Sequence, residues 1–217
     1  MLLRTVLVAI SLTLGSPAFA QVSAQSSGLV SGNALKEMLG KASDSALDRL
    51  SRPGAFSADD AIRIALPGAG KGVGDLMSMT SKAGLTGDIN GSLNRAAEAA
   101  ASQAKPIFRA AINKVSFSDA VGILRGGNTG ATDYLKKSTG GEIRAKLLPL
   151  IRAALEKTGV LKQASQLKAF GMDEAKLIDY VAGKTSDGIF TYVGREETKA
   201  RQDPIGTAGA LLKGLKF

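Results

Sequence analysis

Apolar residues recur at helical spacing along most of this chain, and this periodicity limits its fold more than any other feature of the sequence. The first strong stripe places them on one helix face, at Leu35, Met38, Leu39, Ala42, Ala46, Leu47 and Leu50. A second stripe covers residues 89–115 and has an alanine-rich middle that permits close approach of a neighbouring helix. Residues 62–67 alternate like a strand, but no other segment offers a partner strand, so we expect an extended linker there.

Capping and breaking residues divide these stripes into several helices. Asp88 and Asp173 precede apolar stripes as N-caps, and Gly159 follows one as a C-cap. Residues 139–142 (TGGE) have the spacing of a capping box, so we expect a helix to begin there. Pro106 predicts a kink or a new start within the second stripe. The pattern predicts an all-α fold, an irregular globular multi-helix bundle of roughly eight to ten helices.

Residues 1–20 have the features of a secretory signal peptide. Arg4 gives a positive start, residues 6–14 form an apolar run, and Ala18 and Ala20 fit a cleavage site near Ala20. The alternative is a membrane anchor, which needs roughly 20 apolar residues, and this run is far shorter. We therefore expect the mature chain in the periplasm or secreted from the cell, with no transmembrane segment.

The rest of the chain divides into two parts. Residues 21–32 are rich in serine, glycine and glutamine, which predicts a flexible lead-in. Residues 33–217 are expected to form a single helical domain. The chain has no cysteine, so no disulfide can hold this domain and a hydrophobic core must do so alone.

The charge balance is basic and favours anionic partners. Without Arg4 the chain has 27 basic and 19 acidic residues, a net charge of +8. Lipid headgroups, acidic polysaccharides or nucleic acid would suit this charge. The alternative is a solvated surface that only keeps the protein in solution. Nucleic acid is disfavoured, because the basic residues are scattered, tryptophan is absent and aromatic residues make up 5% of the chain.

The absence of both histidine and cysteine excludes many catalytic mechanisms. Catalytic triads with histidine and zinc or copper sites with these ligands cannot be built, and we expect no metal and no cofactor. Carboxylates, lysine, tyrosine and serine remain, and among them a carboxylate pair can support hydrolysis. Glu98 and Asp133 are our candidates for that alternative. The glycine-rich residues 68–74 fail the phosphate-loop pattern, because Gly70-Lys71 is followed by Gly72, so we interpret them as a connector.

Two polar groups are candidates for ligand binding. Asn94, Arg95 and Glu98 lie within one turn of the second stripe, either as a buried packing network or as the polar end of a pocket. Arg125, Asn128 and Asp133 surround a glycine-rich junction between two helices. Backbone amides at the start of the second of these helices can bind an anion, with Arg125 adding charge. The alternative is a C-cap followed by an N-cap. The charged residues 195–201 are interpreted as a solvated helix end.

Several short motifs together resemble a known family. They are residues 93–100 (LNRAAEAA), 104–108 (AKPIF), 119–120 (DA), 123–124 (IL), 126–127 (GG), 131–135 (ATDYL), 148–149 (LP), 187–190 (DGIF) and 209–213 (GALLK). In combination they resemble a bacterial family known as domain of unknown function 4197, from about residue 35 to the C-terminus. Residues 68–74 depart from the family pattern by being richer in glycine. The resemblance implies an exported helical protein and carries over no catalytic residue.

These observations favour a non-catalytic exported module that binds an anionic ligand or a protein partner. The first alternative is a carboxylate-based hydrolase without histidine, cysteine or zinc. The second is a purely structural protein of the cell envelope, in which the motifs serve packing and capping alone.

Overall fold

The computed structural model describes residues 18–66, 88–118, 120–163, 168 and 172–202. Its elements are the helices α1 (Ala18–Leu50), α3 (Ile89–Ala101), α4 (Lys105–Lys114), α5 (Ala120–Arg125), α6 (Gly130–Thr158) and α8 (Glu174–Gln202), with the 3₁₀ turn η2 (Val160–Gln163). The described ranges contain no strand, which confirms the all-α prediction. These elements are fewer than the eight to ten helices that we expected.

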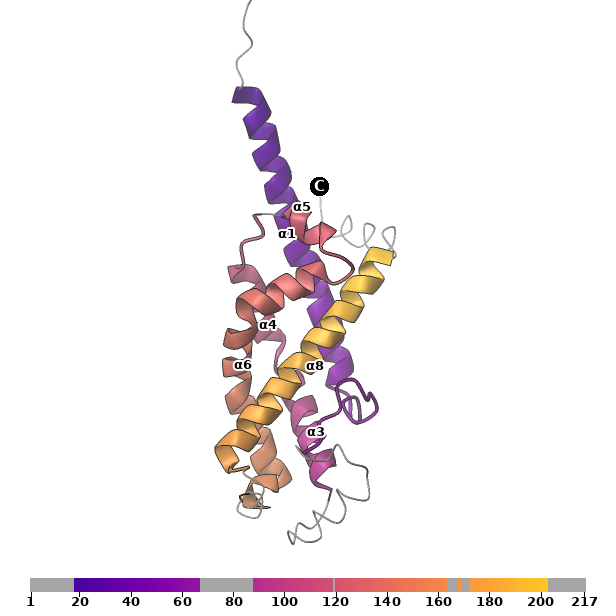
Figure 1. Ribbon diagram of the computed structural model, residues 1–217, viewed down its shortest axis with the longest axis vertical. Coiled ribbons are helices and arrows are strands. Elements are labelled where there is room, and N and C mark those ends of the chain that lie inside the picture. The colour runs from indigo at the N-terminus through magenta and orange to yellow at the C-terminus, as the bar shows by residue number, and fades with distance from the viewer. Residues whose placement is uncertain (1–17, 67–87, 119, 164–167, 169–171, 203–217) are drawn as a thin grey trace, which may run out of the picture.

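The three longest helices, α1, α6 and α8, build the frame of the bundle. α8 crosses the bundle and packs against both α1 and α6. α3 and α4 lie one after the other along the length of the bundle (Figure 1). α3 packs chiefly on α6, and α4 packs chiefly on α1. The short α5 lies at one end of the bundle, where it contacts both α1 and α6.

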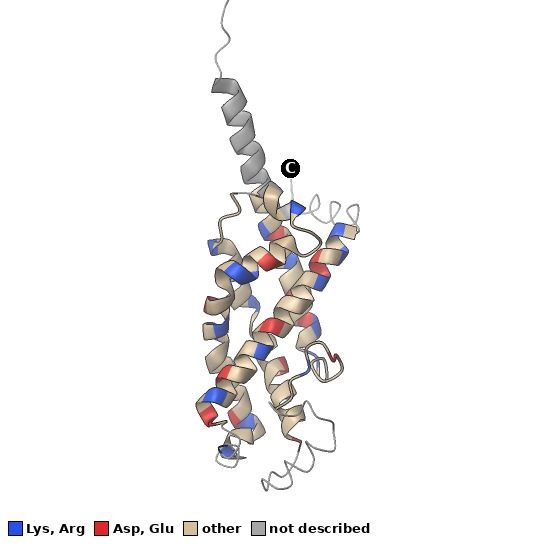
Figure 2. Cartoon of the chain, viewed as in Figure 1, with Lys and Arg blue, Asp and Glu red and all other residues tan. Residues whose placement is uncertain are grey.

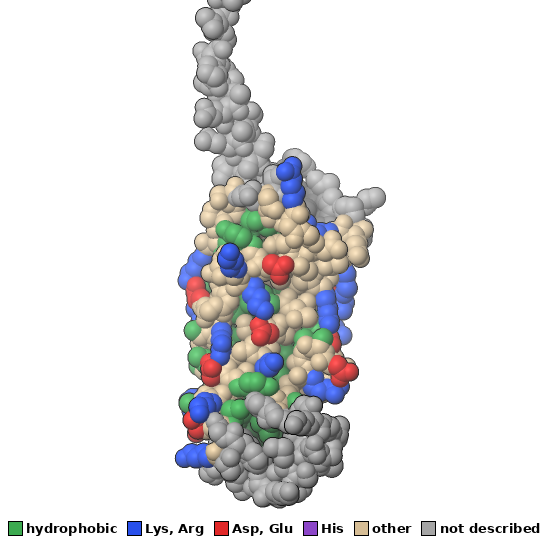
Figure 3. Space-filling model, in the orientation of Figure 1, with side chains coloured by type: hydrophobic (Ala, Val, Ile, Leu, Met, Phe, Trp, Pro, Cys, Tyr) green, Lys and Arg blue, Asp and Glu red, His purple; other side chains and the backbone are tan. Residues whose placement is uncertain are grey.

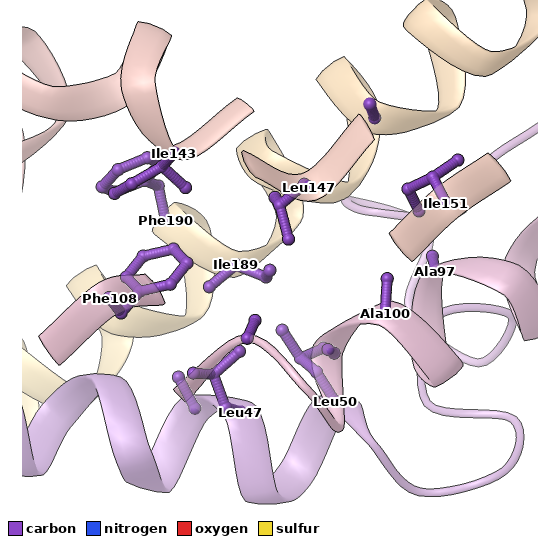
Figure 4. Close-up of a cluster of buried hydrophobic side chains, with 14 of the residues drawn as sticks. Leu47, Leu50, Ala97, Ala100, Phe108, Ile143, Leu147, Ile151, Ile189 and Phe190 are labelled. Atoms are coloured by element: carbon purple, nitrogen blue, oxygen red, sulfur yellow. The ribbon is translucent and has the colours of Figure 1, made fainter. Parts of the chain in front are cut away.

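The longer helices contribute buried apolar side chains to one continuous core, and Ile123 of the short α5 packs against it while partly exposed. Figure 4 shows part of it, with Leu47, Leu50, Ala97, Ala100, Phe108, Ile143, Leu147, Ile151, Ile189 and Phe190 labelled. The rings of Phe108 and Phe190 pack at a centroid distance of 5.4 Å and a tilt of 56°. The alanines on the buried face of α3 are fully inaccessible, as expected for a helix that its neighbours approach closely.

The predicted helix start at residues 139–142 is wrong, because α6 runs through them without a break. Leu135, Ile143 and Leu147 form one buried face across this stretch, and their burial outweighs the cost of about 1 kcal/mol for each helical glycine. Thr139 lies inside the helix, where its hydroxyl donates to the carbonyl of Leu135 at 2.8 Å. Pro149 is also tolerated within α6, on its exposed side.

Other predicted boundaries are confirmed. The carboxylate of Asp88 accepts the N–H of Gly91 at 2.7 Å, and that of Asp173 accepts the N–H of Lys176 at 2.8 Å. Gly159 closes α6 with a φ of 78°, in the left-handed region that favours glycine. Pro106 lies in the first turn of α4, so the second stripe restarts there. Residues 63–66 have no regular structure, in agreement with the expected linker.

The predictions at the two ends and around residue 70 are left open by the structure. Residues 21–32, expected as a flexible lead-in, belong to α1. Residues 1–17 of the predicted signal peptide, the glycine-rich residues 68–74 and residues 203–217 lie outside the described residues. No stretch within the described helices combines the length and the hydropathy that crossing a bilayer demands.

Gly188 marks the tightest contact between α8 and the segment that follows α1. A Cβ atom at Gly188 would lie 2.8 Å from Cε1 of Phe56, whose ring is fully buried. Gly188→Ala is therefore expected to lower the free energy of unfolding by about 1–3 kcal/mol, although alanine is the better helix former. Gly141→Ala is the matched control, since nothing lies within 4 Å of its Cβ position, and it should stabilise by up to about 1 kcal/mol. Urea unfolding followed by circular dichroism measures both, and equal effects would contradict this account.

Candidate functional site

The polar group on α3 bonds to the backbone of the segment between α1 and α3. The side-chain Oδ1 of Asn94 accepts the N–H of Ile64 at 2.9 Å, and its Nδ2 donates to the carbonyl of the same residue at 2.8 Å. Glu98 accepts the N–H of Phe56 at 3.1 Å. Both side chains are buried. They supply hydrogen bonds that this buried backbone would otherwise lack.

This arrangement matches a packing network more closely than a pocket. Asn94 and Glu98 line neither of the two grooves described below. Arg95 points outward instead, where its guanidinium donates to Ser92 Oγ at 2.7 Å and lies 3.4 Å from Asp88.

Side chains of α8 hold the same segment from the other side. Tyr180 donates its hydroxyl to the carbonyl of Ala65 at 2.7 Å, and Tyr192 donates to Asp59 Oδ2 at 3.0 Å. Arg195 also pairs with Asp59 Oδ2, and its guanidinium stacks 4.7 Å from the ring centroid of Tyr192. The hydrogen bond from Arg195, followed by that from the N–H of Ala61, lowers the pKa of Asp59 to about 2.

Glu197 is a buried carboxylate at the N-terminus of α6, although it belongs to α8. It is fully inaccessible and accepts the N–H groups of Ala131 at 3.1 Å and Thr132 at 2.8 Å. The Thr132 hydroxyl donates to it at 2.6 Å, and Arg201 Nε donates at 2.9 Å. Thr129, at the N-cap position, makes no side-chain cap. Glu197 therefore caps α6 from a distant part of the chain, with the favourable sign of the helix dipole.

This finding bears on two interpretations of the sequence. The amides that start α6 were a candidate site for an anion, with Arg125 adding charge, and the alternative was a C-cap followed by an N-cap. The structure places the chain's own Glu197 there, with Arg201 as the cation. The prediction of a solvated helix end over residues 195–201 is wrong for Glu197, because burial of that side chain depends on α6 and leaves no local signal in the sequence.

A groove of about 300 Å³ runs between α6 and α8. Its walls are Thr129, Thr132, Asp133, Lys136, Phe190, Thr191, Gly194, Arg195 and Thr198. Both cations of this α6–α8 groove are already neutralised, since Lys136 pairs with Asp187 at 2.8 Å and Arg195 pairs with Asp59. Its threonine hydroxyls donate to groups within the chain, including Glu197. The cations and the threonine donors of the α6–α8 groove are thus satisfied internally.

A second groove, of about 420 Å³, lies between α5 and α6. Ser118, Gly122, Ile123, Gly126, Gly130, Asp133, Tyr134 and Lys137 line it. The two helices approach closely because Gly130 has no side chain: a Cβ atom there would lie 2.3 Å from the carbonyl oxygen of Ile123. Tyr134 is fixed by a hydrogen bond of 3.1 Å to the carbonyl of Ser116 and by ring packing on Phe117.

One of the residues that the sequence singled out, Asp133, lines this α5–α6 groove and accepts the Thr129 hydroxyl at 2.9 Å. Arg125 and Asn128 are exposed and are not part of the lining, but Arg125 directly precedes the lining residue Gly126 in the chain. Sequence reasoning missed Lys137, Ile123 and Tyr134. Their spacing gave a partial signal, because Asp133, Tyr134 and Lys137 lie within about one turn of a helix.

The cations at the α5–α6 groove, Lys137 in its lining and Arg125 beside Gly126 in the chain, differ from those of the α6–α8 groove in their pairing. Arg125 and Lys137 are exposed, and among the described residues neither meets a carboxylate. On the face shown in Figure 3, blue and red side chains are interspersed, and the ribbon in Figure 2 has the same mixture of basic and acidic positions. The excess positive charge therefore forms no continuous basic face in this view, and the groove is a local feature.

Neither groove has the arrangement of a carboxylate hydrolase. Asp133 is the one carboxylate in the described lining of each groove, and Glu98, its expected companion, bonds to Phe56 instead. Within the described ranges, no group of three or more carboxylates lies close enough together to hold a metal ion.

A family model described as "Protein of unknown function (DUF4197)" matches residues 26–215, which confirms the resemblance seen in the motifs. The match includes both grooves, the α3 network and Glu197. No curated protein and no solved structure matches the chain.

The pair of Asp59 and Arg195 predicts an acid-sensitive contribution to stability. The pKa of Asp59 in the fold, about 2, lies below its ordinary value of 3.8, so the stabilisation is complete above about pH 5 and is lost as pH falls through about 2. Asp59→Asn should lower Tm at pH 6, and the difference from wild type should shrink towards pH 2. Asp60→Asn is the control, since Asp60 is largely exposed and pairs only with its neighbour Arg63. A difference that stays constant from pH 6 to pH 2 would refute the assignment.

Glu197 gives a second prediction about stability. Glu197→Ala leaves two amides of α6 without acceptors and Arg201 without its buried partner, so we expect a loss of about 3–5 kcal/mol in the free energy of unfolding. Glu174, like Glu197, belongs to α8, and it forms an exposed pair with Arg152 of α6. Glu174→Ala removes this pair and should cost less than about 1 kcal/mol. Denaturant titration measures both, and similar losses would show that Glu197 is not a cap.

Proposed function

The chain belongs to the DUF4197 family, whose description assigns no activity, and from its geometry we propose a non-catalytic exported module that binds an anionic partner in the α5–α6 groove. Export rests on the features of residues 1–20. The binding role rests on one observation above all: Lys137 lines a hollow of about 420 Å³, Arg125 directly precedes the lining residue Gly126, and neither cation has a carboxylate partner among the described residues.

Comparison with the other cations supports this choice of groove. Lys136 and Arg195 line the α6–α8 groove but are neutralised by Asp187 and Asp59. Lys157 and Lys162 have no described carboxylate partner either, but they line neither groove. Of the two, the α5–α6 groove combines concave shape with positive charge that has no carboxylate partner within the described ranges. Such a combination is typical of a binding site for a charged ligand.

The two alternatives have less support from the described residues. A retaining or inverting hydrolase needs two carboxyl groups roughly 5–9.5 Å apart, and each groove has a single carboxylate in its described lining. A purely structural role accounts for Asn94, Glu98 and Glu197, which all serve packing. It does not account for the unused charge at the α5–α6 groove.

A paired charge-removal experiment tests the proposal. Arg125→Gln with Lys137→Gln is expected to weaken binding of at least one anionic probe by about fivefold to tenfold. The probes are a synthetic acidic peptide, a heparin-derived hexasaccharide and phosphatidylglycerol vesicles, each titrated against the purified chain by fluorescence. The control, Lys157→Gln with Lys162→Gln, removes equal charge from exposed positions outside the grooves and should leave affinity within about twofold.

Equal losses in the two double variants would mean that net charge alone attracts the probe. That outcome, or binding of no probe at all, would reject the groove as the site. Thermal unfolding of both variants checks that the exposed substitutions leave the fold intact.

A further inference from the structure

We propose that the occupant of the α5–α6 groove is an acidic peptide segment of a partner protein, in which a carboxylate stands beside an apolar side chain. This inference rests on the proposed function and narrows its anionic partner to one chemical class.

The charges of the groove suit a peptide better than a polyanion. Lys137 lines the hollow and Arg125 precedes Gly126 of its lining, and both attract carboxylates, but Asp133 lines the same hollow with a negative charge of its own. A phosphate or sulfate polymer carries a negative charge on every unit and would meet Asp133 unfavourably. A peptide can place its carboxylates at the cations and its backbone N–H groups at Asp133. The Asp133 carboxylate accepts one described hydrogen bond, from Thr129, and an ionised carboxylate can accept several.

One wall of the groove is apolar. Ile123 and Tyr134 line it, and both are only partly buried, so each offers apolar surface to a ligand. The ring of Tyr134 is held in place by Phe117 and Ser116, which makes this wall preorganised. An aliphatic or aromatic side chain would cover this surface, whereas sugar acids and inorganic anions have no group that does so.

Glycines form another part of the lining. Gly122 and Gly126 are exposed and present no side chains, so the main chain of a ligand can approach the main chain of the protein there, whereas Gly130 is buried against the carbonyl of Ile123. The volume of about 420 Å³ lies at the lower end of the range for small-ligand sites, roughly 300–1,000 Å³. The groove therefore accommodates a few residues of a peptide and not a whole helix.

Two synthetic decapeptides of equal charge separate the apolar and ionic contributions. One alternates glutamate with leucine, and the other alternates glutamate with serine. Binding to the full chain is measured by fluorescence anisotropy, alongside the hexasaccharide, the vesicles and inorganic phosphate. We expect the leucine peptide to bind about tenfold more tightly than the serine peptide. Arg125→Gln and Lys137→Gln should each weaken the leucine peptide by about threefold, and Ile123→Thr should reduce the preference for leucine.

Each other outcome overturns the inference in a distinguishable way. In one outcome, the hexasaccharide or the vesicles bind in a manner that depends on Arg125 and Lys137, and neither peptide binds in that manner. The groove is then a site for polyanions or lipid headgroups, so the inference fails and the proposed function stands. If the two peptides bind equally, the apolar wall takes no part. If no probe depends on the two cations, the inference and the proposed function both fail. The exposed charge variants retain the core, so loss of folding at Ile123→Thr would still leave a decisive comparison.

Discussion

Backbone that is buried outside regular secondary structure needs hydrogen-bond partners, and the packing of this bundle depends on how α3 provides them. The segment after α1 brings Phe56 and Ile64 into the core, where water cannot satisfy their amides. Asn94 and Glu98, one turn apart on α3, bond to these two residues and fix the path of the segment. The same segment packs against α8 at Gly188 through Phe56 and Ile62. The hydrogen bonds from α3 therefore hold in place the apolar side chains that contact α8.

A charged side chain satisfies backbone amides in the same way at the start of α6. Glu197 satisfies the first amides of α6 and is itself neutralised by Arg201. Because the chain supplies this anion internally, the start of α6 does not need one from outside. Near the start of α6, the positive charge that has no carboxylate partner among the described residues is on the side chains of Arg125 and Lys137, and not on the helix terminus.

Local patterns predicted the parts of the fold that local physics decides. Stripes and caps at Asp88, Asp173 and Gly159 depend on neighbours three or four residues away, and these were predicted correctly. The capping-box spacing at residues 139–142 gave a wrong helix start. α6 continues through these residues because Leu135 and Ile143 are buried on one continuous face. For the proposed site, sequence reasoning named Arg125, Asn128 and Asp133 as candidates, and it missed Ile123 and Lys137, which meet only where α5 packs on α6. It also missed the role of Glu197, because that environment exists only when the distant helices α6 and α8 meet.

The distance along the chain between Glu197 and the amides it caps has a consequence for folding order. The contact joins residues 66 positions apart, so closing it costs more chain entropy than any contact within α6 itself. The body of α6 can form early from its own turns, but its first turn is completed only when the end of α8 has docked. Since Gly130 and Asp133 belong to that turn, the α5–α6 groove is assembled late. A chain that stops before residue 197 can hold much of the core and still present no finished groove.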